Sequence, residues 1–142
     1  MTICTTSPKQ TQDLAARLAK TSRGGEVIAL QGELGSGKTT FVQGFARAHG
    51  VRRPVRSPTF VFVQTYKLPA TSSRFRYLCH IDAYRLVKKN DHGDLGLHDF
   101  MGKPETVTVI EWPERIKNIL PRKTIWIRFA HGKNQSERVI SF

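Results

Sequence analysis

The chain has 142 residues, of which 39% are hydrophobic and 9% aromatic, a composition typical of a soluble globular protein and not of a disordered one. No stretch approaches the roughly 18 consecutive apolar residues of a membrane span, and the first residues lack the basic start and apolar core of a secretory signal. Cys4 and Cys79 are too few for a disulfide framework, so free thiols in the cytoplasm are expected.

The formal net charge of +12 at pH 7 is unevenly distributed, because most of the excess of Lys and Arg lies after residue 51. Such an excess favours polyanionic partners, such as RNA or an acidic protein surface. A basic proteome or a solubilising surface would explain the same charge. No helix-turn-helix, zinc-finger or RNA-recognition signature is present, and no DNA partner is expected.

The first third of the chain predicts a helix, a buried strand and a second helix. Ser7-Pro8 is typical of a helix start, and Gly24-Gly25 ends that helix. An apolar, β-favouring run at Val27–Leu30 predicts the strand, and apolar residues at helical spacing predict a helix over 38–50. The apolar stripe of the first helix consists of Leu14, Ala15, Leu18 and Ala19.

Between that strand and the second helix lies Gly32-Glu33-Leu34-Gly35-Ser36-Gly37-Lys38-Thr39, a phosphate-binding loop pattern. Its glycines let the main chain approach a ligand, and its N–H groups converge on phosphates at a helix N-terminus. We expect Lys38 to reach the β- and γ-phosphates and Thr39 to bind Mg²⁺. A glycine-rich turn opening an ordinary helix is the alternative, and the strand and helix context argues against it.

The rest of the chain predicts several strands joined by polar turns. A basic connector, residues 52–56, leads to Ser57-Pro58-Thr59-Phe60, where the Thr59 hydroxyl could turn towards a bound phosphate. Short helices are expected at 95–101 and 114–120. Strands are expected at 60–66, 75–82, 107–113, 123–129 and 138–142, with turns at 69–74, 88–94 and around Gly132.

These elements predict one α/β domain over residues 1–142, a P-loop NTPase-like three-layer sandwich with a mixed sheet. Strands ending at Leu30, Asp82 and Glu111 should form its parallel core, with antiparallel hairpins alongside. Ligands of open α/β sheets lie at the carboxyl ends of the strands, so both acids should converge on the loop.

Asp82 and Glu111 are therefore the candidate catalytic carboxylates, together with Lys38. One acid should hold Mg²⁺ and the other should orient the attacking water, and the sequence does not decide which. Each acid could instead cap the helix that follows it. Trp112 could cover the nucleotide, and His80 shares a strand face with Asp82, where it either hydrogen-bonds that carboxylate or is structural.

These motifs resemble those of the TsaE (YjeE) family of small bacterial P-loop ATPases. The resemblance extends over nearly the whole chain, and the set of motifs in this order is quite specific. The stretches that carry it are Gly32–Phe41, Ser57–Phe60, His80–Leu86 and Ile110–Glu114.

The resemblance implies ATP binding with slow hydrolysis in the synthesis of N6-threonylcarbamoyladenosine at position 37 of tRNAs. It implies a TsaB–TsaD heterodimer as the protein partner, with tRNA reached through that complex. By position, Thr39 and Glu111 match the Mg²⁺ ligands, Asp82 matches a residue needed for hydrolysis, and Ser7-Pro8 lies near the adenine. The expected nucleotide contacts are Glu33, Leu34, Gly35, Ser36, Gly37, Lys38, Thr39, Thr40, Thr59 in a switch-like loop, and Trp112.

Two other readings stay open. A small-molecule kinase would need an acceptor pocket and an arginine-bearing lid, whereas residues 88–106 carry only Lys88, Lys89 and Lys103. A nucleotide-gated RNA-binding module would use the basic connector at 52–56. A GTPase is disfavoured, because the Asn-Lys-x-Asp guanine-recognition sequence is missing.

Overall fold

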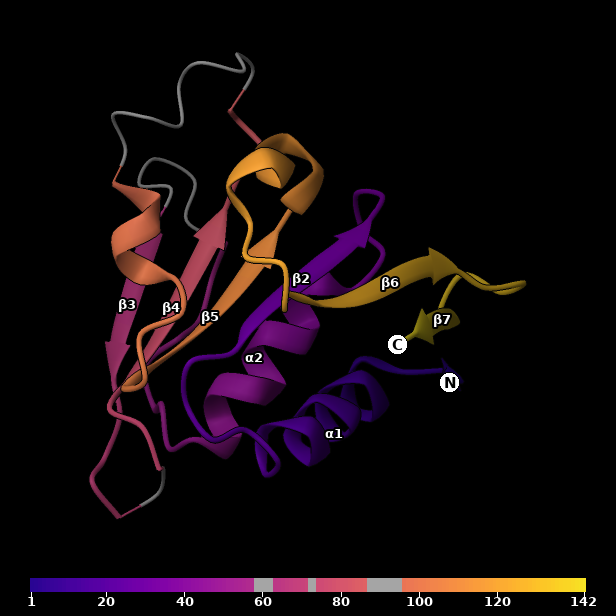
Figure 1. Cartoon of the computed structure of the whole chain (residues 1–142). Helices are drawn as coiled ribbons and strands as arrows, with labels where there is room; N and C mark the ends of the chain where they lie inside the picture. Colours follow the sequence, from indigo (N-terminus) through magenta and orange to yellow (C-terminus); the bar gives the residue numbers. More distant parts are fainter. Residues whose placement is uncertain (58–62, 72–73, 87–95) are drawn as a thin grey trace.

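The computed structural model describes residues 1–57, 63–71, 74–86 and 96–142, and seven strands of these residues form one mixed sheet (Figure 1). Their order across the sheet is β1-β7-β6-β2-β5-β4-β3, so strands far apart in the sequence lie side by side. The strands are β1 (Thr2–Thr5), β2 (Val27–Gly32), β3 (Val63–Lys67), β4 (Tyr77–Asp82), β5 (Thr106–Glu111), β6 (Ile125–His131) and β7 (Arg138–Ser141).

The centre of the sheet is parallel, as the sequence predicts for the strands that end near Leu30, Asp82 and Glu111. β2 pairs with β5, and β5 pairs with β4, all in parallel. The register places Asp82 opposite Glu111 and Glu111 opposite Leu30. The two acids and the start of the phosphate loop therefore meet at one edge of the sheet.

Antiparallel hairpins flank this centre on both sides, which confirms the predicted mixed sheet. β3 pairs with β4 on one side, and β6 pairs with β7 on the other. β6 also pairs in parallel with β2, so its position extends the parallel core by one strand. The edge strand β1, which the sequence analysis does not anticipate, pairs with β7 through four residues, of which only Thr5 is buried.

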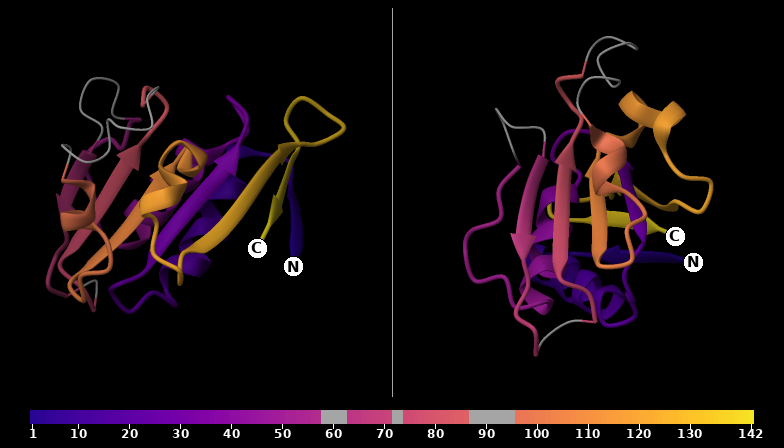
Figure 2. Two further views of the ribbon diagram at one scale, coloured as in Figure 1. Left: turned by 45° about the horizontal axis from the view of Figure 1, so that its top comes forward. Right: turned by 60° about the vertical axis from the view of Figure 1, so that its left-hand side comes forward.

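Two α-helices, α1 (Pro8–Ala19) and α2 (Lys38–Ala48), pack against each other and cover one face of the sheet (Figure 2). The Ser7 side chain caps α1 by accepting a hydrogen bond from the Gln10 N–H at 3.3 Å, as the Ser-Pro pair predicts. Gly44 of α2 lets the two helices approach closely, because a Cβ there would lie 2.5 Å from the Gln12 carbonyl oxygen.

The opposite face of the sheet carries two short 3₁₀ segments, η1 (Leu97–Phe100) and η2 (Pro113–Ile119), over a second apolar cluster (Figure 2). The segments predicted at 95–101 and 114–120 thus form 3₁₀ turns, and residue 95 lies outside the described residues. The strand predicted at 107–113 ends at Glu111, because Trp112 takes a left-handed φ of 58°. No helix in the described ranges has the length and apolar character needed to cross a bilayer.

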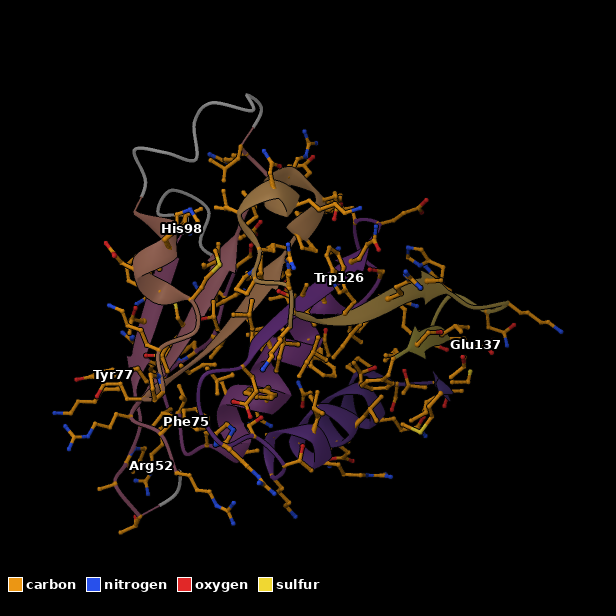
Figure 3. All side chains as sticks on the ribbon, viewed as in Figure 1. Arg52, Phe75, Tyr77, His98, Trp126 and Glu137 are labelled. Carbon is orange, nitrogen blue, oxygen red and sulfur yellow. The ribbon has the colours of Figure 1, made fainter. Side chains whose placement is uncertain are left out.

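The end of α2 far from the phosphate loop is fixed by side-chain contacts. His49, directly after α2, meets the ring of Phe75 with centroids 4.7 Å apart; Figure 3 labels Phe75. The Gln43 side chain donates to the Val55 carbonyl at 3.0 Å, which holds the connector after α2 against the helix. The connector then delivers Ser57 to the edge of the sheet where the acids lie. Of the strand predicted at 60–66, residues 60–62 lie outside the described residues.

Candidate functional site

The phosphate loop joins β2 to α2 with the backbone geometry that its glycines permit. Gly37, the residue before α2, has a φ of 101°, a left-handed conformation that other residues rarely adopt. A side chain at Gly32 would place its Cβ 2.5 Å from the Phe129 carbonyl oxygen on β6. The first N–H groups of α2 have no partners within the helix, so they form a positive end that suits an anion.

Lys38, the first residue of α2, is buried over this loop. Its Nζ donates to the Gly32 carbonyl at 2.7 Å and to the Glu33 carbonyl at 2.8 Å, and it lies 4.2 Å from the centroid of the Trp112 ring. Burial lowers the pKa of the Lys38 ammonium, and the carboxylates of Glu111, Glu114 and Asp82 oppose that shift.

Glu111, at the end of β5, is held by two side chains from different elements. The Thr39 hydroxyl lies 3.0 Å from each carboxylate oxygen, and the His80 Nε2 lies 2.9 Å from Oε1. Both Glu111 and His80 are buried. The partner of His80 is therefore Glu111 and not Asp82, which corrects one of the two expectations for this histidine. The reason is that His80 and Glu111 project from neighbouring parallel strands onto the same face.

Asp82, at the end of β4, is engaged by backbone and side-chain donors. The Ser57 hydroxyl donates to its Oδ2, and the Tyr84 N–H donates to its Oδ1 at 2.9 Å. The Tyr84 ring packs on Trp112, with centroids 4.9 Å apart. Asp82 thus links the connector after α2 to the turn after β4, beside the Glu111 carboxylate.

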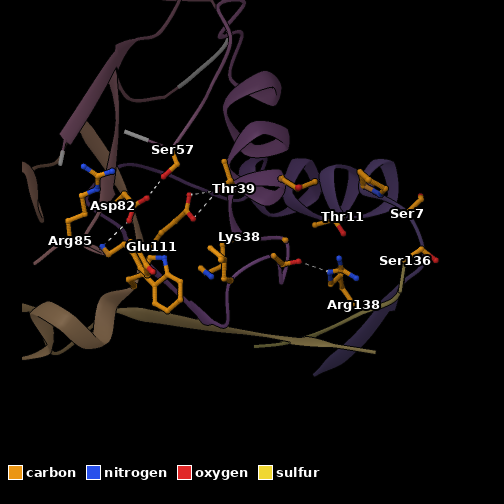
Figure 4. A pocket seen from close by; sticks show the side chains of 17 residues that line it. Ser7, Thr11, Lys38, Thr39, Ser57, Asp82, Arg85, Glu111, Ser136 and Arg138 are labelled. Atoms are coloured by element: carbon orange, nitrogen blue, oxygen red, sulfur yellow. Dashed lines mark hydrogen bonds between the residues drawn. The ribbon is translucent and has the colours of Figure 1, made fainter. Parts of the chain in front are cut away.

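These groups line one cavity of about 570 Å³, a size typical of small-molecule sites (Figure 4). Its wall also includes residues from the start of α1 and from the hairpin between β6 and β7, elements remote in the sequence. The lining residues are Ser7, Pro8, Thr11, Leu34, Gly35, Gly37, Lys38, Thr39, Thr40, Ser57, Asp82, Tyr84, Arg85, Glu111, Trp112, Ser136 and Arg138.

Most residues predicted for the site lie on this wall, and the exceptions have specific positions. Glu33 contributes its backbone carbonyl to Lys38, and its side chain is exposed. Ser36 is buried beneath the loop, with its hydroxyl 3.5 Å from the Lys38 Nζ. Thr59 lies outside the described residues. Of the lid that a kinase would need, residues 88–95 also lie outside them.

Ser136 and Arg138 line the cavity although no sequence signal indicates them. They reach it because β7 pairs with β6, and β6 pairs with β2, which carries the loop. The sequence of β7 alternates like any half-buried strand and contains no motif. Nothing in it therefore indicates contact with a loop that lies about 100 residues earlier in the chain. The Arg138 Nε donates to the Gly35 carbonyl at 3.1 Å.

Comparison with known proteins identifies relatives of this chain and agrees with its fold. The family model described as "Threonylcarbamoyl adenosine biosynthesis protein TsaE" matches residues 5–140. The chain is 35% identical over 141 residues to the tRNA threonylcarbamoyladenosine biosynthesis protein TsaE of Bacillus subtilis (strain 168), covering 97% of this chain and 82% of that protein. It is 41% identical over 113 residues to the protein of the same name from Aquifex aeolicus (strain VF5), covering 78% and 75%.

Among solved structures, the crystal structure of Bacillus subtilis YdiB superposes with a TM-score of 0.79 at 30% sequence identity. The match covers 99% of this chain and 82% of that chain. A family match over most of the chain, relatives at this level of identity and a shared fold lead to one conclusion: the chain belongs to the TsaE family.

Proposed function

We propose that this chain binds ATP with Mg²⁺ in the cavity and hydrolyses it slowly, in support of N6-threonylcarbamoyladenosine modification of tRNA. The observation that carries the proposal is the Glu111 carboxylate, fixed 3.0 Å from the Thr39 hydroxyl at the N-terminus of α2. The relatives named for this modification pathway support the biological setting. A TsaB–TsaD-type heterodimer is the proposed partner.

The oxygen atoms around Thr39 fit the chemistry of Mg²⁺. This ion favours oxygen ligands and is commonly held by one or two carboxylates together with substrate phosphates. Thr39 and Glu111 would hold it, and His80 would fix the orientation of the Glu111 carboxylate. When bound, Mg²⁺ neutralises charge that develops on the phosphate oxygens.

We assign the second acid, Asp82, to orienting the water that attacks the terminal phosphate. Both of its oxygens already accept hydrogen bonds, from Ser57 and from the Tyr84 N–H. Each carboxylate oxygen can accept two hydrogen bonds, so both can still accept one from a water. The contact with Ser57 restricts where that water lies, and a partner that displaced the connector at Ser57 would change its position, which supports dependence of turnover on a partner.

The test is calorimetric titration with ATP and Mg²⁺, followed by phosphate-release assays with and without the TsaB–TsaD heterodimer. Lys38→Ala should abolish ATP binding, because it removes the only cation that the loop itself supplies. Arg122→Ala, which removes an exposed cation outside the cavity, is the matched control and should bind like the parent. Equal ATP affinity in the Lys38→Ala variant would contradict the proposal.

One observation favours a second function, direct binding of RNA. A groove of about 380 Å³ lies beside the end of α2, and four arginines line it. None of them forms an ion pair with a carboxylate of the described residues. The Arg53 guanidinium donates to the Thr65 carbonyl at 2.8 Å and lies 4.4 Å from the Tyr66 ring centroid, so its direction is fixed. The four are Arg47, Arg52, Arg53 and Arg56, and Figure 3 labels Arg52.

Guanidinium groups bind phosphate oxygens in pairs, and such contacts weaken steeply with salt. The test measures tRNA binding to the isolated chain by fluorescence anisotropy at several salt concentrations. The double variant Arg52→Ala, Arg56→Ala should bind more weakly and show a shallower salt slope. The double variant Arg122→Ala, Lys123→Ala removes the same charge away from the groove and should change affinity less. Equal losses in both would show a general charge effect and refute the groove as an RNA site.

A further inference from the structure

Four consecutive carbonyl groups of the phosphate loop accept hydrogen bonds from side chains. Those of Gly32 and Glu33 accept from the Lys38 Nζ at 2.7 and 2.8 Å. The Leu34 carbonyl lies 3.2 Å from the His131 Nε2, and the Gly35 carbonyl accepts from the Arg138 Nε at 3.1 Å. Since a carbonyl oxygen can only accept, the His131 Nε2 must carry the proton in this contact.

The second pair of donors comes from the C-terminal hairpin. His131 and Arg138 are cross-strand partners at the turn end of the β6–β7 hairpin. The Arg138 Nη1 also donates to the Gln135 carbonyl at 2.7 Å and to the Glu137 carbonyl at 2.8 Å, so the guanidinium is anchored within the hairpin turn. Figure 4 shows Arg138 reaching from the hairpin to the loop.

These contacts fix more than the carbonyl groups. The C=O and N–H of a planar trans peptide point in opposite directions. Holding the Leu34 and Gly35 carbonyls on the hairpin therefore fixes the directions of the Gly35 and Ser36 N–H groups. The Ser36 N–H accordingly closes a turn to the Glu33 carbonyl at 3.2 Å. A loop with its amide directions already set loses less entropy when an anion binds.

The two pairs of donors differ in what a ligand would do to them. Lys38 is the residue that would turn to a bound phosphate, and it would then leave the Gly32 and Glu33 carbonyls. His131 and Arg138 contact the loop from the hairpin and can keep their carbonyls at the same time. They can thus hold the second half of the loop whether or not Lys38 is engaged.

We propose that His131 and Arg138 are positioning residues that hold the phosphate loop in its anion-binding shape. The proposal rests on the proposed ATP binding for its functional consequence, whereas its structural part concerns the chain without nucleotide. It assigns a role to the C-terminal hairpin, which otherwise lies outside the loop, the metal ligands and the acids.

The first test measures hydrogen exchange of the Ser36 amide in the chain without nucleotide, because this N–H of the loop donates to the Glu33 carbonyl. His131→Phe and Arg138→Met should each accelerate exchange, on the order of tenfold, because one hydrogen bond holding the loop is lost. Arg128→Met is the matched control, since Arg128 is an exposed arginine on β6 that lines no part of the cavity. Unchanged exchange in both hairpin variants would overturn the proposal, whatever the outcome for ATP.

The second test measures ATP affinity and turnover. Both hairpin variants should weaken ATP binding about tenfold, with the turnover number at saturating ATP changed less than about twofold, because the loss is in uniform binding. Should the parent chain fail to bind ATP, the proposed function fails and the exchange experiment alone decides the role of the hairpin. If Arg138→Met weakens ATP binding while loop exchange stays at the parent rate, Arg138 contacts phosphate directly and the positioning role is refuted.

Arg138 also supports the hairpin turn, so its replacement could unfold that turn. His131→Phe avoids this difficulty, because His131 contacts the loop through one atom and takes no part in the turn contacts of Arg138. Arg138→Lys supplies a second check, since it keeps the charge but loses the planar fork that reaches three carbonyls. Slower exchange in Arg138→Lys than in Arg138→Met would support the positioning role, because the lysine ammonium can still donate to the Gly35 carbonyl.

Discussion

Two substitutions of Glu111 distinguish the role of its negative charge from the role of its hydrogen bonds. Glu111 meets the Thr39 hydroxyl at 3.0 Å and the His80 Nε2 at 2.9 Å. In Glu111→Gln, the side-chain oxygen can still accept from both partners, and only the charge is lost. In Glu111→Ala, the buried His80 Nε2 loses its partner as well.

The expected stabilities follow from these contacts. A buried donor left without its acceptor costs about 1–3 kcal/mol, so Glu111→Ala should lower the free energy of unfolding by this amount. For a chain of this size that corresponds to a decrease in Tm of roughly 3–10 °C. Glu111→Gln should change stability by less than about 1 kcal/mol, because each hydrogen bond has a replacement. Urea denaturation of the two variants and the parent measures the difference.

The two Glu111 variants should differ in stability but lose similar amounts of activity. Both variants lose the negative charge that we assign to Mg²⁺ binding, so Mg²⁺-dependent phosphate release should fall at least about 10²-fold in each. Both should still bind the base of the nucleotide, as titration with ATP without added metal would show. If Glu111→Gln hydrolyses ATP as fast as the parent, the assignment of Glu111 to the metal is wrong. If Glu111→Ala is as stable as Glu111→Gln, the contact with His80 has no energetic role.

Three further predictions concern the stability of the fold and the accessibility of its cysteines. Gly44→Ala should destabilise the chain by about 1–3 kcal/mol in urea denaturation, because the new Cβ would meet the Gln12 backbone. Alanine favours helices more than glycine does, so a gain in stability would contradict the close approach of α1 and α2. Burial lowers the pKa of His49, so this side chain binds a proton more tightly in the unfolded chain than in the folded one. The free energy of unfolding should therefore fall as the pH decreases from about 7 to about 5, and His49→Gln should remove part of this pH dependence. Burial raises the pKa of the Cys79 thiol to about 12, so a thiol reagent at neutral pH should label exposed Cys4 in the native chain and Cys79 only on unfolding, as mass spectrometry would reveal.

Several parts of the site could be predicted because their signals are local. The strand, glycine-rich loop and helix around Lys38 are encoded within about 20 adjacent residues, and each local preference agrees with the next. Asp82 and Glu111 are each the first acid after an apolar run, and the rule that ligands lie at the carboxyl ends of parallel strands brings them together. The Ser7-Pro8 start of α1 is likewise decided by adjacent residues.

Other parts could not be predicted because they depend on the order and register of strands. His80 shares a strand face with Asp82, yet it contacts Glu111, which projects onto the same face from the neighbouring strand, two residues beyond Val109, the partner of His80 in the register. The strand expected to continue through Trp112 stops at Glu111, and the backbone turn there brings the Trp112 ring over Lys38. Strand propensity contains no information about that turn.

The sequence by itself determined that this chain has a phosphate loop at a helix N-terminus, two acids at strand ends and a mixed α/β sheet. Only the tertiary structure decided that β6 lies directly beside β2, and that the hairpin beyond it supplies His131 and Arg138 to the loop. The physical reason is the range of the interactions. Backbone preferences and hydrophobic periodicity act between near neighbours, whereas the partner of a polar side chain is set by which strands the whole core brings side by side.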